Sequence, residues 1–263
     1  MQTFPGQTFP GPDAARGSGS PSAAGDPVLL ETRQLSKQFG GVHAVADIDL
    51  HLLRGELRCL IGPNGAGKST FFKMLSGQIR PSGGAILFDG TEITGLPRHA
   101  IARLGIGIKN QVPSVWESLS VYEHFWIAAR RQNGARAAAR LTDELLSVLE
   151  LGSVAGRAVG ALSHGMRQWV EIGMVIAQGP KLILLDEPTA GMAADEVERT
   201  AALLRSINRQ ATLVVVEHDM QFVEQIAGLV TVFHQGRILI EGSMTDVLAA
   251  AAVREVYLGS ARA

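Results

Sequence analysis

The segment GPNGAGKST at residues 62–70 restricts the fold of this 263-residue chain more than any other feature. It follows a short apolar stretch typical of a buried strand and precedes a stretch typical of a helix. Its glycines let the backbone wrap around an oxygen-rich anion so that successive N–H groups point at it. Strand, glycine-rich turn and helix in this order predict a phosphate-binding loop. The glycines are Gly62, Gly65 and Gly67.

Two side chains of this loop carry the expected chemistry. We expect Lys68 to reach the β- and γ-phosphates of a nucleotide as a point charge and the Ser69 hydroxyl to bind Mg²⁺. The alternative is a glycine-rich turn that matches by chance, but the strand and the helix at its ends argue against it. The predicted nucleotide-binding residues of the loop are Gly62, Pro63, Asn64, Gly65, Ala66, Gly67, Lys68, Ser69 and Thr70.

Two adjacent carboxylates end the apolar stretch LILLDE at residues 182–187. Asp186, at the end of a predicted buried strand, is suited to hold Mg²⁺, and Glu187 is suited to orient and polarise an attacking water. The alternative for this pair is a helix cap and a first-turn acid. Together with the phosphate-binding loop, the pair predicts hydrolysis of a nucleoside triphosphate.

Two further polar residues follow predicted strands. His218 comes after the strand LVVVE, so we expect it on the same sheet edge as Glu187, although a lone histidine is more often structural or exposed. Gln111 follows the strand IGIK and precedes a helical region, where it is placed to sense the γ-phosphate and to signal to that region.

Buried strands alternate with helices along most of the chain, which favours an α/β fold with a mostly parallel sheet and ligands at the carboxyl ends of its strands. Residues 1–27 are rich in Pro, Gly, Ser and Ala, and we expect a disordered tail there. The fold begins at Val28. Residues 120–163 carry helical patterns with no strand between them, which predicts an inserted helical lobe.

Composition excludes several classes of protein. The 24 Lys and Arg residues balance 25 Asp and Glu residues, so the basic footprint of a nucleic-acid-binding protein is missing. The single cysteine, Cys59, excludes an internal disulfide and a cysteine-based zinc cluster, and its apolar neighbours predict a core residue. No apolar run approaches the ~20 residues of a membrane-spanning helix, and no secretion signal is recognisable. We therefore expect a cytoplasmic chain.

The segment LSHGMRQ at residues 162–168, here called the signature motif, predicts the start of a helix. A first turn of the form Ser-x-Gly can present free N–H groups and the positive end of the helix dipole to a phosphate. His164 is either an exposed first-turn residue without a role or a titratable group near phosphate. We interpret the motif as able to bind phosphate, and we expect His164→Gly to leave hydrolysis nearly unchanged.

These motifs, in this order and spacing, resemble the ATPase subunit of an ATP-binding cassette (ABC) transporter over about residues 28–260. The resemblance implies a P-loop NTPase with a RecA-like core, an antiparallel β subdomain and an inserted α-helical subdomain at about residues 112–178. It also implies ATP and Mg²⁺ as cofactors, and two subunits that close head to tail around two ATP molecules. The segments that carry it are GPNGAGKST, Gln111, LSHGMRQ, LILLDEPTAG and VVEHD.

The resemblance also implies roles for individual residues. Phe39 matches the position of the aromatic residue that stacks on adenine, with core packing as the alternative. Trp116 and Trp126 fall around the lobe that contacts the membrane subunit in this family, with core or interface packing as the alternative. The implied catalytic residues are Lys68, Gln111, Glu187 and His218; the implied Mg²⁺ ligands are Ser69, Gln111 and Asp186; the residues implied to bind the partner's ATP are Ser163, His164 and Gly165.

Finer features are similar to importers of branched-chain amino acids and amides. LSHG followed by QWVEIGM is most similar to the subunit that serves urea uptake. This similarity implies membrane permease subunits, a second ABC ATPase subunit that is a copy or a different chain, and indirectly a solute-binding protein, at the inner face of the cell inner membrane. The segments that carry it are FGGVHAV, EPTAGM, EHDMQFVEQIA, VTVFHQGRILIEG and VREVYLG.

Two residues depart from the family pattern. Met166 stands where the family usually has Gln, and a thioether cannot replace the hydrogen bonds of an amide. Ala193 stands where the family often has Asp or Asn in the D-loop, the segment 190–193 that helps to couple the two sites. Both put the equivalence of the two ATP sites in question.

We expect an ATP-driven import motor for urea or short amides, with branched-chain amino acids as the alternative substrate. A cassette that acts on nucleic acid or ribosomes usually has a second cassette, a coiled coil or basic extensions, which this chain lacks. A P-loop kinase would need neither the signature motif nor His218. A regulatory cassette that barely hydrolyses ATP is suggested by Met166 and Ala193 and opposed by Glu187 and His218.

Overall fold

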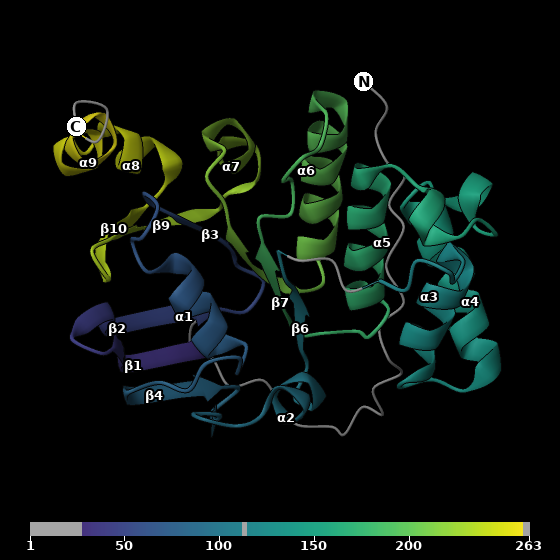
Figure 1. Cartoon of the computed structure of the whole chain (residues 1–263), viewed down its shortest axis with the longest axis horizontal. Coiled ribbons are helices and arrows are strands. Elements are labelled where there is room, and N and C mark those ends of the chain that lie inside the picture. Colours follow the sequence, from purple (N-terminus) through teal and green to yellow (C-terminus); the bar gives the residue numbers. More distant parts are fainter. Residues whose placement is uncertain (1–27, 112–114, 260–263) are drawn as a thin grey trace, which may run out of the picture.

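The computed structural model describes residues 28–111 and 115–259 and contains two β-sheets with helices packed between and around them (Figure 1). The predicted tail at residues 1–27 lies outside the described residues. In the larger sheet, five neighbouring strands are parallel and the edge strand β10 pairs antiparallel with β9, which confirms the predicted mostly parallel sheet. In sheet order its strands are β10 (Arg237–Gly242), β9 (Leu229–His234), β3 (Leu57–Ile61), β8 (Thr212–Val216), β7 (Leu182–Asp186) and β6 (Ile106–Lys109).

The smaller sheet is antiparallel and lies beside the larger one (Figure 1). Its two long strands pair from Val28 against Leu53 to Phe39 against Val42, as their strand-like alternation predicts. In sheet order its strands are β2 (Val42–Leu53), β1 (Val28–Phe39), β4 (Gly83–Phe88) and β5 (Thr91–Glu92).

Helices cover both faces of the larger sheet. Helix α1 lies between the two sheets, while α3 and α4 lie at the end of the molecule remote from α8 and α9 (Figure 1). The described residues between 120 and 163 hold helices and no strand, as predicted. The helices are α1 (Lys68–Leu75), α2 (Arg98–Arg103), α3 (Val121–Arg130), α4 (Ala135–Val148), α5 (His164–Ile176), α6 (Ala194–Asn208), α7 (Met220–Ile226), α8 (Met244–Ala249) and α9 (Ala251–Gly259), with 3₁₀ turns at Gly152–Val154 and Val159–Ala161.

Alternate residues of the large sheet supply two separate apolar cores. Leu60 of β3 and Leu184 of β7 pack with α1 and the small sheet, whereas their neighbours Cys59 and Ile183 pack with helices on the opposite face. Cys59 is fully buried, as its apolar neighbours predict. The large sheet is therefore fixed from both faces, and the positions of the loops at its carboxyl edge are fixed with it.

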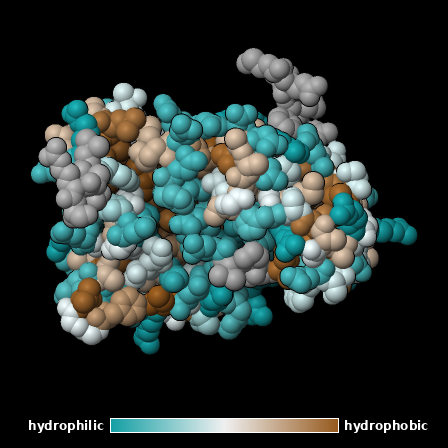
Figure 2. All heavy atoms as spheres, turned by 45° about the horizontal axis from the view of Figure 1, so that its top comes forward, coloured by the Kyte–Doolittle hydropathy of each residue, from teal (hydrophilic) through white to brown (hydrophobic). Residues whose placement is uncertain are grey.

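On the face shown in Figure 2, hydrophilic residues cover most of the area and hydrophobic residues form small separate groups. In the described part of the chain, no helix combines the length and the apolar character that crossing a membrane requires.

Candidate functional site

The phosphate-binding loop connects β3 to α1, as predicted, and two of its glycines have no room for a side chain. A Cβ at Gly62 would lie 2.3 Å from the Phe233 carbonyl oxygen, and one at Gly67 would lie 2.5 Å from the Ala44 carbonyl oxygen. Gly65 has open space around it but a φ of +80°, which glycine adopts most easily. The loop is therefore pressed against the backbone on one side, and its shape depends on these glycines.

Lys68 opens helix α1 and turns back over the loop that precedes it. Its Nζ donates hydrogen bonds to the carbonyl oxygens of Gly62 at 2.5 Å and Pro63 at 3.1 Å. Burial lowers the pKa of Lys68, while the nearby carboxylates of Glu187 and Asp186 act in the opposite direction. The ammonium group is thus held between the loop backbone and the acidic groups. Ser69 and Thr70 follow in the first turn of the helix.

The two carboxylates end strand β7 in different environments. Asp186 is buried, and its burial, followed by the neighbouring charge of Glu187, raises the pKa of its carboxyl group. Glu187 is partly exposed and has a φ of +46°, and its N–H donates to the Val216 carbonyl oxygen at 3.0 Å. This left-handed backbone conformation is uncommon for a residue with a side chain. It turns the chain at the sheet edge just after the buried Asp186.

Gln111 and His218 meet at Glu187. The sequence predicts His218 on this edge of the sheet beside Glu187, but it does not predict the contact of Gln111 with Glu187. The Gln111 Nε2 donates to one carboxylate oxygen of Glu187 at 2.8 Å. His218 Nδ1 lies 3.6 Å from the other oxygen. Three strand ends therefore bring an amide, a carboxylate and an imidazole to one point at the carboxyl edge of the sheet.

Glu217 is a site residue that sequence reasoning missed. It is 1% exposed, and its carboxylate accepts from the Thr189 hydroxyl at 2.6 Å and from the His218 N–H at 3.0 Å. It ties the segment after Glu187 to the end of β8. The available signal was a carboxylate directly after an apolar strand, the same signal that identified Asp186.

Lys109 and Glu171 form a buried ion pair behind Gln111. Their charged atoms lie 3.8 Å apart, and the two side chains are 1% and 7% exposed. Burial lowers the pKa of Lys109, against the effect of the nearby carboxylates, first that of Glu171. The pair borders a cavity of about 210 Å³ and joins the last residue of β6 to the helix of the signature motif.

The signature motif begins helix α5, as predicted, with Ser163 as the N-cap. The Ser163 hydroxyl accepts from the Met166 N–H at 3.3 Å. His164 is not an isolated first-turn residue, because its Nε2 lies 2.9 Å from the Ala190 carbonyl oxygen of the D-loop. Met166 packs partly buried against the core. In the described part of the chain, the hydrogen bonds of Ser163 and His164 do not reach the phosphate-binding loop.

Phe39 and the tryptophans occupy different environments. Phe39 ends β1 with 48% exposure and the Lys37 ammonium 5.0 Å from its ring centroid, so core packing does not explain it. Trp116 is 57% exposed and Trp126 is partly buried under Arg130. Trp169 is buried.

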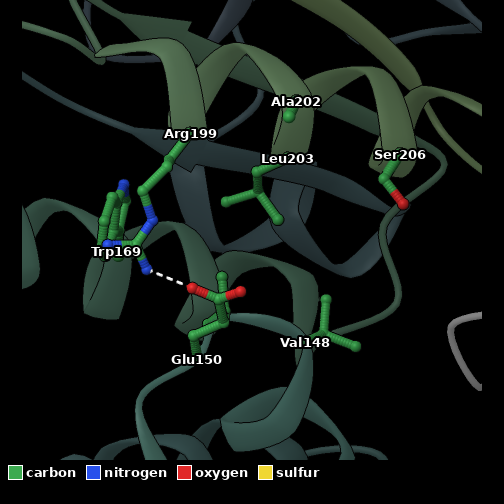
Figure 3. Close-up of a pocket in the computed structure, with 8 residues that line it drawn as sticks. Val148, Glu150, Trp169, Arg199, Ala202, Leu203 and Ser206 are labelled. Carbon is green, nitrogen blue, oxygen red and sulfur yellow. Dashed lines mark hydrogen bonds and ion pairs between the residues drawn. The ribbon is translucent and has the colours of Figure 1, made fainter. Parts of the chain in front are cut away.

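A small pocket lies between the end of α4 and helices α5 and α6 (Figure 3). Arg199 stacks 4.3 Å above the Trp169 ring and pairs with the Glu150 carboxylate at 2.5 Å. The pocket volume is about 40 Å³, which accommodates a water or two rather than a nucleotide. This pocket is therefore not the nucleotide site.

The residues around the phosphate-binding loop fit a nucleotide and a divalent cation. The loop is a glycine cradle at a helix N-terminus with an ammonium inside it, which suits phosphate oxygens. Ser69, Gln111 and Asp186 offer the oxygen donors that Mg²⁺ prefers. The described part of the chain holds no group of three His, Cys, Asp or Glu residues placed to bind a metal by themselves.

The fold and the site together define a P-loop nucleoside triphosphatase of the cassette type. A family model described as ABC transporter matches residues 45–190, and the chain belongs to this family. As an enzyme it is therefore an ATP-binding and ATP-hydrolysing cassette.

Curated relatives cover almost the whole cassette. The branched-chain amino acid transport ATP-binding protein BraF of Pseudomonas aeruginosa is 32% identical over 89% of this chain and 98% of its own length. The lipopolysaccharide export ATP-binding protein LptB of Acidithiobacillus ferridurans is 34% identical over 88% and 97%.

Solved structures agree with this assignment. The ADP conformation of MJ1267, an ATP-binding cassette of an ABC transporter, superposes with a TM-score of 0.79 at 25% identity, over 89% of this chain and 99% of that one. CbiO1 of Clostridium perfringens, part of the transporter complex cbiONQ, gives 0.77 at 30% identity over 90% and 97%. The predicted α/β P-loop fold is therefore confirmed.

Proposed function

We propose that this chain is the ATP-hydrolysing motor of an importer that takes up urea or short amides. The observation that carries the motor role is the position of Glu187, whose carboxylate lies between the Gln111 amide and the His218 imidazole beside the loop that holds Lys68. A carboxylate fixed in this way can orient a water and accept its proton. His218 positions this carboxylate and stabilises charge that develops near it.

The other site residues hold the nucleotide. Backbone N–H groups of the phosphate-binding loop and the Lys68 ammonium bind its phosphates, and Phe39 stacks on the adenine ring. Ser69, Gln111 and Asp186 would hold Mg²⁺, which neutralises phosphate charge when bound. Lys68 must leave the Gly62 and Pro63 carbonyl oxygens to reach a phosphate, so nucleotide binding replaces two internal hydrogen bonds.

A second ATPase subunit completes the site. Within the described part of the chain, Ser163 and His164 make their hydrogen bonds to their own helix and D-loop, which leaves the phosphate-binding loop open to the motif of another subunit. We infer a head-to-tail pair in which Ser163 and Gly165 face the partner's nucleotide. The resemblance to importers of branched-chain amino acids and amides favours a pair of two different ATPases.

Membrane permease subunits are the partners that ATP hydrolysis by this chain drives. Trp116 and Ile127, 57% and 44% exposed, give the helical region near Gln111 apolar surface for such a contact. We place the chain at the inner face of the cell inner membrane, with a solute-binding protein as an indirect partner. The balanced charge provides no support for nucleic acid as a partner.

Two separate observations bear on the identity of the transported substrate, and they favour different candidates. The combination LSHG and QWVEIGM supports urea, whereas the names of BraF and LivG, both 32% identical to this chain, support branched-chain amino acids. LptB, an export protein, has 32–34% identity, so overall identity alone does not select the substrate.

Uptake of labelled urea and labelled leucine tests both proposals. Cells that lack this chain are restored with wild type or with Lys68→Ala, which removes the phosphate-binding cation. Return of urea uptake with wild type alone supports the motor and its substrate. Return of leucine uptake instead would replace urea by the second candidate, and return of neither would overturn the import role.

A further inference from the structure

The His164 ring contacts the D-loop of its own chain. Its Nε2 lies 2.9 Å from the Ala190 carbonyl oxygen. The next residue, Gly191, has a φ of +74°, and a Cβ there would lie 3.1 Å and 3.2 Å from two ring atoms of His164. The ring therefore packs closely on the Ala190–Gly191 backbone, at a position where a side chain would interfere.

The hydrogen bond to Ala190 determines which nitrogen of the His164 ring carries a proton. A carbonyl oxygen only accepts, so Nε2 must carry a proton to bond Ala190. Gln168, one helical turn further along α5, places its side-chain amide 3.1 Å from the same Nε2. The nearer amide atom is the nitrogen, itself a donor, so with a proton on Nε2 the hydrogen bond of the ring is the one to the Ala190 carbonyl oxygen.

The contact is the first of several that join α5 to the D-loop and to α6, the helix that follows the D-loop. A Cβ at Gly165 would lie 2.3 Å from the Glu196 carboxylate, which occupies that space and accepts from the Ala193 N–H at 3.0 Å. Further along, the Trp169 Nε1 donates to the Thr200 hydroxyl at 2.9 Å. These contacts join the signature motif to both ends of the D-loop.

Deeper along the same helices, Arg199 of α6 lies over the Trp169 ring and pairs with Glu150 of the helical region (Figure 3). The two helices are thus firmly joined below the D-loop. At its Ala190 end, by contrast, the contact with the signature motif depends on the His164 ring.

We propose that His164 is a positioning residue that holds the D-loop against the signature motif, so that both segments meet the partner subunit's nucleotide as one rigid unit. This role rests on the proposed function, because only a paired ATPase presents both segments to a second nucleotide. It replaces the expectation from sequence that His164→Gly leaves hydrolysis nearly unchanged. His164 acts through the D-loop backbone and not through phosphate.

Two substitutions separate the hydrogen bond from the bulk of the ring. His164→Gln keeps an N–H donor at a similar reach, and His164→Met keeps the bulk without a donor. His99→Met is the matched control, because His99 is an exposed histidine on helix α2. All variants are made in the full chain.

Hydrogen exchange of residues 190–193 in the isolated subunit tests the contact directly. We expect His164→Met to speed exchange there about fivefold, and His164→Gln and His99→Met to match wild type. Unchanged exchange in His164→Met, or an equal change in His164→Gln, would overturn the proposed contact, whatever the transporter does.

ATP turnover in the assembled complex tests the consequence. We expect His164→Met to lower kcat five- to tenfold with KM changed less than twofold, since the phosphate-binding loop is untouched, and His164→Gln to keep at least half of the wild-type kcat. If exchange increases and turnover does not fall, the positioning role is wrong. If the wild-type complex itself has no turnover, the proposed function fails, while the exchange result still decides the contact.

Discussion

The side-chain amide of Gln111 donates a hydrogen bond of 2.8 Å to the carboxylate of Glu187. These residues follow β6 and β7, which are neighbours in the sheet, and His218 approaches the other carboxylate oxygen from beyond the end of β8. The proposed base is therefore fixed by strands rather than by a free loop. Any displacement of Gln111 acts directly on Glu187.

Replacement of Glu187 by Gln should lower ATP turnover by about 100-fold or more, because an amide does not accept the proton of the attacking water. ATP binding should persist, and ATP should hold the subunits together as a stable pair. Phosphate release and size-exclusion chromatography with ATP measure the two effects. Glu224→Gln, at an exposed position on α7, is the control. Wild-type turnover in Glu187→Gln would remove Glu187 from the proposed mechanism.

Replacement of Gly67 by Ala should abolish tight ATP binding. The added Cβ would lie 2.5 Å from the Ala44 carbonyl oxygen, and the φ of +105° adds strain of roughly 1–2 kcal/mol for a residue with a side chain. We expect the affinity for ATP to fall at least about tenfold, measured by titration with a fluorescent analogue. Gly41→Ala, where a Cβ meets nothing within 4 Å, should bind as wild type. Equal affinities would show that the loop adapts.

The carboxyl edge of the large sheet was predictable because its signals are local. Each of Asp186, Gln111 and His218 comes just after an apolar run that forms a strand, and parallel strands bring such positions together. The bend after Asp186 was not predictable, because a positive φ at Glu187 depends on its hydrogen bond to Val216.

Contacts between distant segments could not be predicted in the same way. Lys109 and Glu171 stand among apolar neighbours and pair only because α5 packs beside β6. Likewise, His164 and Ala190 are 26 positions apart, and no pattern in the sequence links them. Such pairs are determined by how elements pack, which neither periodicity nor motif spacing encodes.

Loss of one partner of the Lys109–Glu171 pair should strongly destabilise the fold. Lys109→Met removes the cation that lies 3.8 Å from the buried Glu171 carboxylate, and we expect a loss of about 3 kcal/mol in the free energy of unfolding. The expected loss lies at the lower end of the range that is usual when a buried ion pair is broken, because the adjoining cavity of about 210 Å³ has room for water.

The double variant Lys109→Met with Glu171→Leu tests the origin of that loss. It removes both charges and should recover most of the stability in denaturant unfolding. Arg33→Met, which breaks an exposed pair with Glu31, is the control and should change stability by less than about 1 kcal/mol. A double variant as unstable as Lys109→Met would show that packing rather than charge determines the effect.

Replacement of Asp186 by Asn should stabilise the nucleotide-free chain while it removes activity. Burial and the Glu187 charge raise the pKa of Asp186 above its ordinary value of 3.8, so the folded state binds this proton more tightly than the unfolded state does. The contribution of Asp186 to stability therefore falls as the pH rises from about that value through the raised pKa. Above the raised pKa the carboxylate is charged, and its burial beside Glu187 opposes folding. Asn removes this penalty, and we expect the Tm to rise by roughly 2–4 °C at pH 7, with the gain shrinking towards pH 4.

Asp143→Asn, at an exposed position on α4, is the control and should show no such pH-dependent gain. ATP turnover should be lost in Asp186→Asn alone, since the carboxylate is the proposed Mg²⁺ ligand. A lower Tm for Asp186→Asn at pH 7 would mean that the carboxylate stabilises the empty site, contrary to the environment that surrounds it.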